Sequence, residues 1–165
     1  MIIIDGADCT GKTTLAKSIC EALGAQYLHC SYDKRWDMEQ YHRLMLHTAG
    51  KLEESAKVPV VMDRWALSEH AYGNAYRDGP SYDTVELMKE AVQAYNPTLI
   101  YCRTDHAAKT HAYMRNTRNE MFDDITKVLA EYDNIIAEGK HPSHILYDYT
   151  KHDREAFVDA FCMAH

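Results

Sequence analysis

The chain has 165 residues, is 46% hydrophobic and carries 18 Lys and Arg against 25 Asp and Glu, for a formal net charge of −7. This length predicts a single domain over residues 1–165 with one core. The acidic balance argues against a broad nucleic-acid-binding face, because affinity for a phosphate backbone is built from clustered cations. Small anionic ligands held by a few cations are compatible with it.

Apolar runs in the sequence are only a few residues long, far short of the roughly 18 that cross a bilayer, and the start does not resemble a leader. We therefore expect a cytoplasmic protein with no membrane partner. The five cysteines include no C-x-x-C pair, and the ten histidines show no metal-ligand spacing. Neither disulfides nor a transition-metal site is predicted.

The first predicted strand, Met1–Asp5, runs into a segment with the pattern G-x-x-x-x-G-K-[ST], and a helix-period stretch follows. This is the strand–loop–helix context of a P-loop, whose backbone N–H groups converge on phosphate oxygens. Lys12 would reach the β- and γ-phosphates, and the Thr13 hydroxyl would be a ligand of Mg²⁺. The residues expected to bind ATP are Gly6, Ala7, Asp8, Cys9, Thr10, Gly11, Lys12, Thr13 and Thr14.

Four further strand-like runs alternate with helix-period stretches, which predicts a parallel sheet covered by helices on both faces. The later strands are expected at Gln26–Cys30, Val58–Asp63, Thr98–Arg103 and Ile145–Tyr149. The helices are expected at Lys12–Leu23, Trp36–Lys57, Arg64–Ala75, Tyr82–Tyr95, Asp105–Asn119 and Glu120–Glu138, with a last one capped by Thr150 or Asp153.

Three details of these helices can be checked directly. Gly24 and Gly139 are expected to end the helices that precede them. In the second helix, the residues expected to face the core are Leu44, Met45 and Leu52. The polar stretch 105–119 reads as a helix broken by a mobile loop, which would form a lid at about residues 105–120.

A second motif follows the third predicted strand and reads D-R-W-x-x-S-x-x-A-Y, from Asp63 to Tyr72. It resembles the D-R-[YF]-x-x-S-x-x-A-Y element of thymidylate kinases, whose first loop also carries an internal aspartate, as Asp8 does here. A segment that includes Arg118 and Glu120 is similar to the D-R-x-E lid element of bacterial members. The short chain resembles compact members of the kind that viruses, phages among them, encode.

This resemblance implies a three-layer P-loop kinase fold with a five-stranded parallel sheet in the order 2-3-1-4-5, and a homodimer. In that family the arginine after the strand-three aspartate holds the acceptor phosphate, which makes Arg64 the candidate here. A guanidinium suits this role, because it pairs bidentately with phosphate and keeps its charge. Asp8 would contact the acceptor sugar and organise the arginine and the metal. Arg115 and Arg118 would close over the transferred phosphoryl group.

Other polar positions keep two interpretations. Asp63, at the carboxyl end of a central strand, is a candidate partner for Mg²⁺ or for Lys12. Asp8 and Asp5 could belong to the phosphate site or only cap the loop or a helix. Arg64 could be a salt-bridged surface residue, and charged residues in the lid segment are also common on solvated helices.

The acceptor base is expected to stack on aromatic residues, and Ser68 lies on the same element as two of them. The aromatic candidates are Trp36, Tyr41, Tyr72 and Tyr76, although aromatics at helical spacing are more often part of a core. Thymidylate kinases usually place a polar amide after the A-Y pair to read the pyrimidine edge, whereas Gly73 follows here. The identity of the base therefore stays open.

The sequence predicts an ATP- and Mg²⁺-dependent deoxynucleoside monophosphate kinase of nucleotide biosynthesis, acting on dTMP or a related, including a modified, pyrimidine deoxynucleotide. Three alternatives stay open. A deoxynucleoside kinase would need a carboxylate base, for which Asp33 or Asp63 would have to serve. A second alternative phosphorylates hydroxyls of nucleic acid, including hydroxymethylated DNA. A third binds nucleotide as a sensor without transferring a phosphoryl group.

Overall fold

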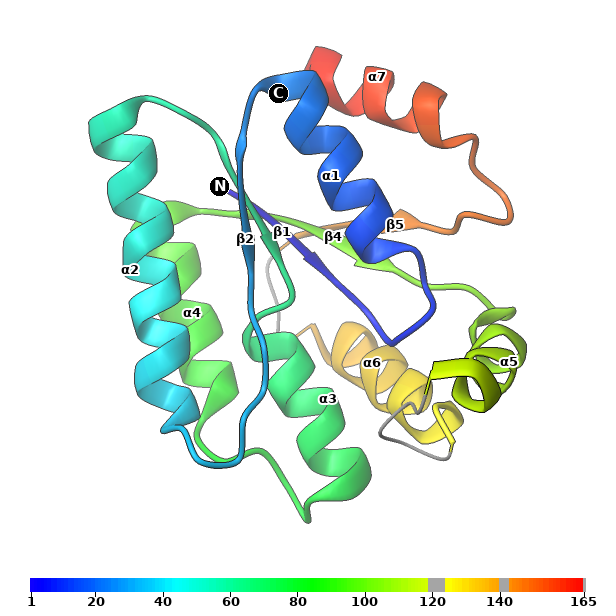
Figure 1. Cartoon of the computed structure of the whole chain (residues 1–165). Helices are drawn as coiled ribbons and strands as arrows, with labels where there is room; N and C mark the ends of the chain where they lie inside the picture. The colour runs from blue at the N-terminus through cyan, green and yellow to red at the C-terminus, as the bar shows by residue number, and fades with distance from the viewer. Residues whose placement is uncertain (119–123, 140–142, 165) are drawn as a thin grey trace.

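The computed structural model describes residues 1–118, 124–139 and 143–164, without the side chains of residues 115–118. One sheet of five parallel strands has the order β2-β3-β1-β4-β5, with helices on both faces (Figure 1). The strands are β1 (Ile2–Asp5), β2 (Gln26–His29), β3 (Val60–Asp63), β4 (Thr98–Cys102) and β5 (His144–Tyr147). The helices are α1 (Lys12–Leu23), α2 (Met38–Ala56), α3 (Ala66–Tyr76), α4 (Thr84–Tyr95), α5 (Ala107–Arg118), α6 (Thr126–Glu138) and α7 (Arg154–Ala164). The predicted sheet and its strand order are confirmed.

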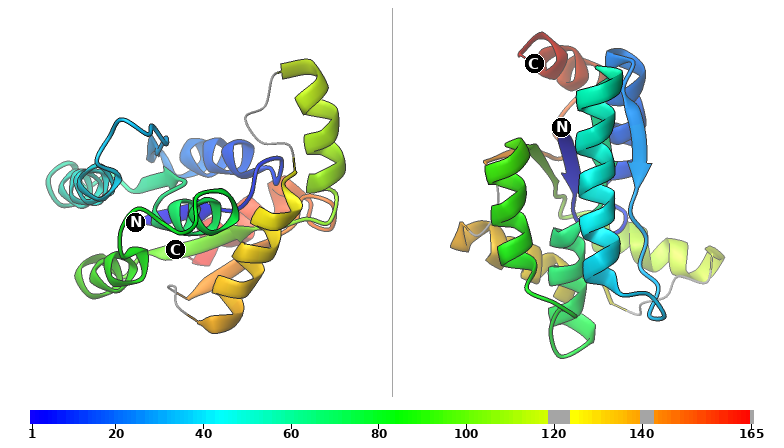
Figure 2. Two further views of the ribbon diagram at one scale, coloured as in Figure 1. Left: turned by 90° about the horizontal axis from the view of Figure 1, so that it is seen from below. Right: turned by 90° about the vertical axis from the view of Figure 1, so that its left-hand side faces the viewer.

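Two apolar clusters, one on each face of the sheet, hold the layers together. One cluster joins the sheet to α1 and α7, through residues such as Leu15 and Phe161. The other joins it to α2, α3, α4 and α6, through residues such as Leu46 and Tyr132. Figure 2 shows these layers from two further sides, with α5 standing apart at one end of the molecule. No helix in the described ranges is long and apolar enough to span a membrane.

The central strands explain where a ligand site forms. β1 and β3 are buried along their whole length, as expected for strands covered on both faces, whereas β2 and β5 form partly exposed edges. β1 and β3 are parallel neighbours in which Ile4 is paired with Asp63. Their carboxyl ends therefore meet at one edge, and the segments that follow, starting at Gly6 and Arg64, lie side by side.

Capping residues set the start of two helices. α2 and α4 each begin two residues later than predicted, because the side chains of Asp37 and Asp83 accept hydrogen bonds from their first turns.

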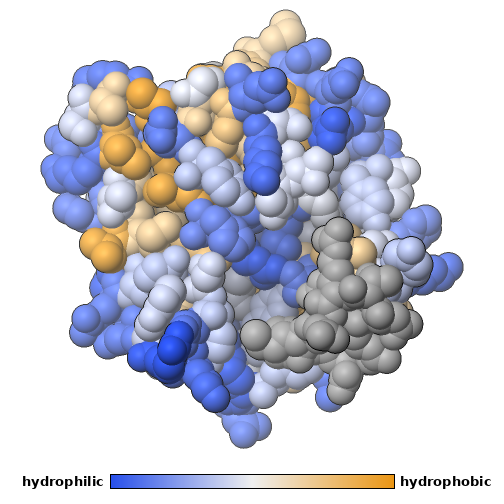
Figure 3. All heavy atoms as spheres, viewed as in Figure 1, coloured by the Kyte–Doolittle hydropathy of each residue, from blue (hydrophilic) through white to orange (hydrophobic). Residues whose placement is uncertain are grey.

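The prediction that Leu44 faces the core is wrong, since this side chain is 61% exposed, and α2 buries Leu46 and Ala49 instead. On the face seen in Figure 3, apolar side chains gather over α2 and the neighbouring β2, while the centre is hydrophilic.

Two further features differ from the predicted ones, whereas two predicted helix ends are confirmed. The predicted break in the lid helix does not occur between Ala107 and Arg118, while residues 119–123 lie outside the described part of the chain. α6 begins at Thr126, six residues later than predicted, where Asp124 accepts the first N–H of the helix at 2.8 Å. Gly24 and Gly139 do end α1 and α6, both in the left-handed conformation.

The chain after β5 makes a turn that the sequence assigned to the strand. β5 ends at Tyr147, because the side chain of Asp148 accepts a hydrogen bond from the Thr150 N–H at 3.0 Å and starts the turn. Thr150 therefore belongs to this turn. Asp153, the other predicted cap, accepts a first-turn N–H of α7 at 2.9 Å and caps that helix.

Candidate active site

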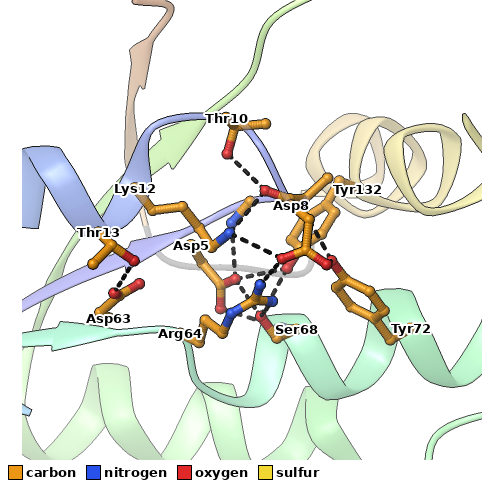
Figure 4. Close-up of polar contacts among 12 residues, drawn as sticks. Asp5, Asp8, Thr10, Lys12, Thr13, Asp63, Arg64, Ser68, Tyr72 and Tyr132 are labelled. Carbon is orange, nitrogen blue, oxygen red and sulfur yellow. Dashed lines mark hydrogen bonds and ion pairs between the residues drawn. The ribbon is translucent and has the colours of Figure 1, made fainter. Parts of the chain in front are cut away.

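The loop between β1 and α1 has the geometry of a phosphate-binding turn (Figure 4). Its backbone takes positive φ at Gly6 (150°), Cys9 (61°) and Gly11 (83°), which folds the loop back over the start of α1. The hydroxyl of Thr10 donates to the Ala7 carbonyl at 2.7 Å and closes the turn. The N-terminus of α1 then points into the loop, where its unpaired N–H groups and dipole favour an anion.

Gly6 occupies a position that no side chain fits. A Cβ atom there would lie 2.2 Å from the carbonyl oxygen of Cys102 at the end of β4. The neighbouring main chain leaves no room, because the obstacle is backbone of a central strand. The glycine at this position of the motif is therefore required by close packing of the loop against β4 as well as by its φ.

We predict that Gly6→Ala lowers the free energy of unfolding by at least about 2 kcal/mol and abolishes nucleotide binding, because the loop must move off β4. Gly24→Ala is the matched control, since Gly24 also has positive φ but a Cβ there meets nothing within 4 Å. This control should cost about 1 kcal/mol. Urea denaturation and ATP titration measure both effects, and equal destabilisation by the two variants would contradict the packing argument.

Lys12 is buried under the loop, and its ammonium group is bonded to the loop main chain. Its Nζ donates to the Ala7 carbonyl at 2.8 Å and lies 3.8 Å from Oδ1 of Asp8. Burial, together with the nearby charge of Arg64, lowers the pKa of Lys12 to about 8, although the surrounding aspartates oppose the shift. A phosphate ligand would supply the negative charge that this ammonium group lacks.

The lowered pKa of Lys12 predicts the pH dependence of nucleotide binding. Below about pH 8 the free protein already carries the charged ammonium that phosphate requires. Above this pH the group is neutral, so binding must take up a proton and the affinity for ATP should fall by up to about tenfold per pH unit. Calorimetric titration between pH 7 and 9.5 measures this fall. Lys12→Arg, which keeps its charge, should remove the dependence, and an unchanged wild-type affinity over this range would contradict it.

Thr13 and Asp63 meet beside the loop, as the sequence proposed for a magnesium site. The Thr13 hydroxyl donates to Oδ2 of Asp63 at 2.6 Å, and Tyr27 and His29 contact the same oxygen at 2.7 Å and 3.3 Å. Burial opposes ionisation of Asp63, but hydrogen bonds from His29, Thr13 and Tyr27 outweigh it and lower its pKa to about 2.

The surroundings of the other oxygen of Asp63 show whether Thr13 and Asp63 suit a metal ion. Oδ1 is buried and has no hydrogen-bond partner among the described residues. A carboxylate that stays ionised, with one oxygen unused and a hydroxyl beside it, offers the hard oxygen ligands that Mg²⁺ prefers. Thr13 and Asp63 therefore fit the ion.

Arg64 follows β3 and turns back toward the loop. Its φ of 69° is left-handed and Trp65 is extended, so α3 begins at Ala66 rather than at Arg64 as predicted. The guanidinium pairs with Asp8, lies 3.5 Å from the Ser68 hydroxyl and sits 5.4 Å from the ring centroid of Tyr72. This strained backbone aims a cation at the P-loop.

Asp8 joins the P-loop to α3. The hydroxyl of Tyr72 donates to its Oδ2 at 2.7 Å, while the Asp8 N–H donates to the same hydroxyl at 3.0 Å. Burial disfavours the charged carboxylate, but Arg64 and Lys12 outweigh it and hold the pKa of Asp8 below its ordinary value. One carboxylate thus pairs with two cations.

Asp5 lies beneath this constellation and is completely buried. Its carboxylate accepts hydrogen bonds from the N–H groups of Trp65 and Ser68 at 3.0 Å and 3.2 Å, so a residue of β1 caps the start of α3. The hydroxyls of Ser68 and Tyr132 also donate to it, at 2.6 Å and 2.7 Å. Burial nevertheless raises the pKa of Asp5. These hydrogen bonds favour the capping interpretation. They also hold the chain that directly follows Arg64.

A cavity of about 480 Å³ opens beside Arg64, and its walls come from the P-loop, the end of β2, α2 and α3. Of the predicted substrate-binding residues, four line it together with Tyr76: Asp8, Arg64, Ser68 and Tyr72. Sequence reasoning missed the remaining lining residues: His29, Cys30, Ser31, Tyr32, Lys34, Met38, His42, Trp65, Glu69 and Arg77. Apart from Trp65, which stands in the D-R-W motif, no motif marks them, because the end of β2, the loop after it, α2 and α3 become neighbours only in the folded chain.

Other predicted residues lie elsewhere. Trp36 lines a neighbouring cavity of about 420 Å³ instead and packs on Tyr41 at 5.0 Å between ring centroids. The hydroxyl of Tyr41 accepts the Ser31 N–H at 3.3 Å, and its ring packs against the core. Arg115 and Arg118 belong to α5, but their side chains lie outside the described residues.

Comparison with known proteins found similar structures but no similar sequence. No protein-family model matches the chain, and no curated protein matches its sequence. Among solved structures, the YorR protein from Bacillus subtilis, in complex with phosphorylated GDP, has a TM-score of 0.69 at 16% identity, over 99% of this chain and 94% of that chain. The likeness shows a shared fold.

Deoxyadenosine kinase from M. mycoides is similar as well. Its structure with the products dCMP and a flexible dCDP has a TM-score of 0.60 at 14% identity, over 99% of this chain and 97% of that chain. Its structure with bound dATP has a TM-score of 0.59 at 17% identity, with the same coverage of both chains. The predicted three-layer P-loop kinase fold is thereby confirmed.

Proposed function

We propose that this protein is a phosphotransferase that acts on nucleotides. More particularly, it is an ATP- and Mg²⁺-dependent deoxynucleoside monophosphate kinase, whose acceptor is dTMP or a related, including a modified, pyrimidine deoxynucleotide. The observation that carries this proposal is the placement of Arg64. It lies in the cavity wall, paired with Asp8 of the P-loop, so that an anion bound to it faces the phosphates on the loop.

The donor side of the reaction uses the loop and the start of α1. The loop N–H groups would hold the β- and γ-phosphates, and Lys12, now bonded to a loop carbonyl, would turn to the γ-phosphate oxygens. Mg²⁺, when bound near Thr13 and Asp63, supplies positive charge that bridges the phosphates. We assign Arg115 and Arg118 on α5 to the charge that develops on the transferred group.

The acceptor side needs a second anion held in line with the first. Arg64 would take the 5′-phosphate of the acceptor bidentately, while Asp8 and Tyr72 keep its guanidinium in place. Transfer between two phosphates depends mainly on position and on surrounding cations, so no nucleophilic side chain is required. The two cations around Asp8 match the charge of such a ligand.

Kinases that phosphorylate a hydroxyl need a base near it, and the candidates for that role are poorly placed. Asp33 pairs with Arg35 and is not among the residues that line the cavity. Asp63 is completely buried and bonded to Thr13 and Tyr27. A deoxynucleoside kinase is still the second candidate, because two of the similar structures are of deoxyadenosine kinase.

Product analysis separates the two candidates. Purified protein is incubated with ATP and Mg²⁺ and with each of dTMP, dUMP, dCMP, 5-hydroxymethyl-dUMP, thymidine, deoxycytidine and deoxyadenosine, and the products are resolved by ion-exchange chromatography. We expect a deoxynucleoside diphosphate and one ADP per turnover from a pyrimidine monophosphate, and nothing from the nucleosides. Formation of monophosphates alone would establish the second candidate. A kinase of this class would act in the cytoplasm, and the homodimer stays a prediction from the resemblance.

A further inference from the structure

The cavity wall contains a second arginine–carboxylate pair, which the proposed transfer step does not use. Nη2 of Arg77 donates to Oε2 of Glu69 at 2.8 Å and to the main-chain oxygen of the same residue at 3.3 Å. The Glu69 side chain is 2% exposed, and its Oε1 accepts from the N–H and the hydroxyl of Ser81 at 3.0 Å and 2.9 Å. Both carboxylate oxygens are therefore occupied, which fixes the guanidinium in one orientation.

An aromatic ring holds the same guanidinium from its flat side. Cζ of Arg77 lies 4.2 Å from the ring centroid of Tyr32, a distance at which ring and cation attract. Arg77 directly follows α3, whereas Arg64 precedes it, and both line the cavity. The two arginines therefore flank α3 and line the same cavity, and each is paired with a carboxylate.

The two arginines differ in charge balance, and this separates their roles. Arg64 and Lys12 both pair with the carboxylate of Asp8, so two cations at that end of the cavity can face an incoming phosphate. Arg77 is matched one to one by the buried Glu69. A neutralised guanidinium is a poor phosphate site but a good donor to a neutral acceptor atom, since arginine has five N–H donors and no acceptor.

We propose that Arg77, oriented by Glu69, Ser81 and Tyr32, reads the edge of the acceptor base and selects bases that present an oxo group there. This rests on the proposed function, since it places the acceptor in the same cavity. Uracil and thymine carry an acceptor oxygen at C4 where cytosine carries an amino group, and guanine and adenine differ in the same way at C6. A donor-only side chain binds the oxo group and leaves an amino group facing N–H bonds.

Glu69 and Ser81 are positioning residues in this arrangement. Because the carboxylate is buried and each of its oxygens already accepts a hydrogen bond, it is a weak competitor as an acceptor for an amino group on the base. The preference therefore comes from Arg77 alone, and its loss should change the ratio between an oxo and an amino base rather than the overall rate.

The test compares dUMP with dCMP, two pyrimidines that differ at C4 and N3. Dissociation constants by calorimetry and kcat/KM with ATP and Mg²⁺ are measured in parallel. Wild-type protein should prefer dUMP, and Arg77→Gln, whose amide both donates and accepts, should lower that preference by about 10- to 100-fold. Arg77→Gln leaves the carboxylate of Glu69 without its cation. The double variant Glu69→Gln, Arg77→Gln removes this carboxylate as well and should lower the preference for dUMP to the same extent. Arg43→Gln is the control, since Arg43 pairs with Glu39 and Glu90 outside the cavity.

Equal losses for both nucleotides, or a wild-type protein with no preference for dUMP, would overturn the role of Arg77. A binding preference that depends on Arg77 without diphosphate from any monophosphate would keep the base-reading role and remove the proposed kinase activity. If neither nucleotide binds at all, both proposals fail.

Discussion

Replacement of Lys12 by Met is expected to lower kcat for phosphoryl transfer by about 10³-fold, the loss typical of removing one preorganised charge from a transition state. Lys12 is the buried cation whose Nζ lies at the phosphate turn, bonded to the Ala7 carbonyl. The same Nζ lies 3.8 Å from Oδ1 of Asp8. The assay follows ADP and diphosphate formation at saturating ATP and monophosphate.

This loss should occur without loss of the fold. The lowered pKa of Lys12 means that the folded protein disfavours its charged form, so the neutral side chain of Met should lower the free energy of unfolding by no more than about 1 kcal/mol. Lys17→Met is the control, since Lys17 lies on the exposed side of α1. Full turnover by Lys12→Met would refute the assignment of the loop.

The second large effect is expected at Arg64. Arg64→Gln should lower kcat/KM for the acceptor monophosphate by about 10²- to 10³-fold, because the bidentate contact with the acceptor phosphate disappears. Affinity for ATP alone should change by less than about threefold, since the proposed site of the donor phosphates is the loop itself and not Arg64. Steady-state kinetics with each substrate varied in turn, together with ATP titration, separate the two effects.

Arg64→Lys sharpens this test. The variant keeps the positive charge and the left-handed backbone at this position, but a single ammonium replaces the planar fork. We expect an intermediate loss, with KM for the monophosphate raised more than kcat is lowered. An equal fall in the affinities for ATP and for the monophosphate would show instead that Arg64 only supports the P-loop through Asp8.

Much of the fold follows from local patterns in the sequence. β1 and β3 are predicted as strands because they are continuous apolar runs. Gly24 and Gly139 end helices because glycine adopts the left-handed conformation at little cost. The P-loop could be predicted for the same reason, since a short contiguous segment carries all of its chemistry.

Boundaries that depend on side-chain capping or on strain were less predictable. Arg64 fits a helical period, yet its backbone is left-handed because Asp5 of β1 binds the N–H groups of Trp65 and Ser68 and fixes where α3 starts. Leu44 fits an inward stripe but faces solvent, since α2 is packed through Leu46. These features come from tertiary contacts that periodicity does not contain.

The candidate site shows the same division. Asp8, Arg64 and Tyr72 belong to motifs and do lie together. Tyr132 reaches Asp5 across 127 positions of sequence, and Arg77 reaches back over α3 to Glu69, so neither could be found from spacing. Only the packing of the helices around the cavity reveals them.

In the proposed reaction the P-loop and Arg64 hold the phosphates of the donor and the acceptor in line with each other. A bisubstrate compound, in which adenosine and thymidine are joined through five phosphates, probes this arrangement in a calorimetric titration with Mg²⁺. We expect it to bind at least about 100-fold more tightly than ATP or dTMP, because one tether brings both halves together. Arg64→Gln should remove this gain. Binding no tighter than that of ATP itself would contradict the account.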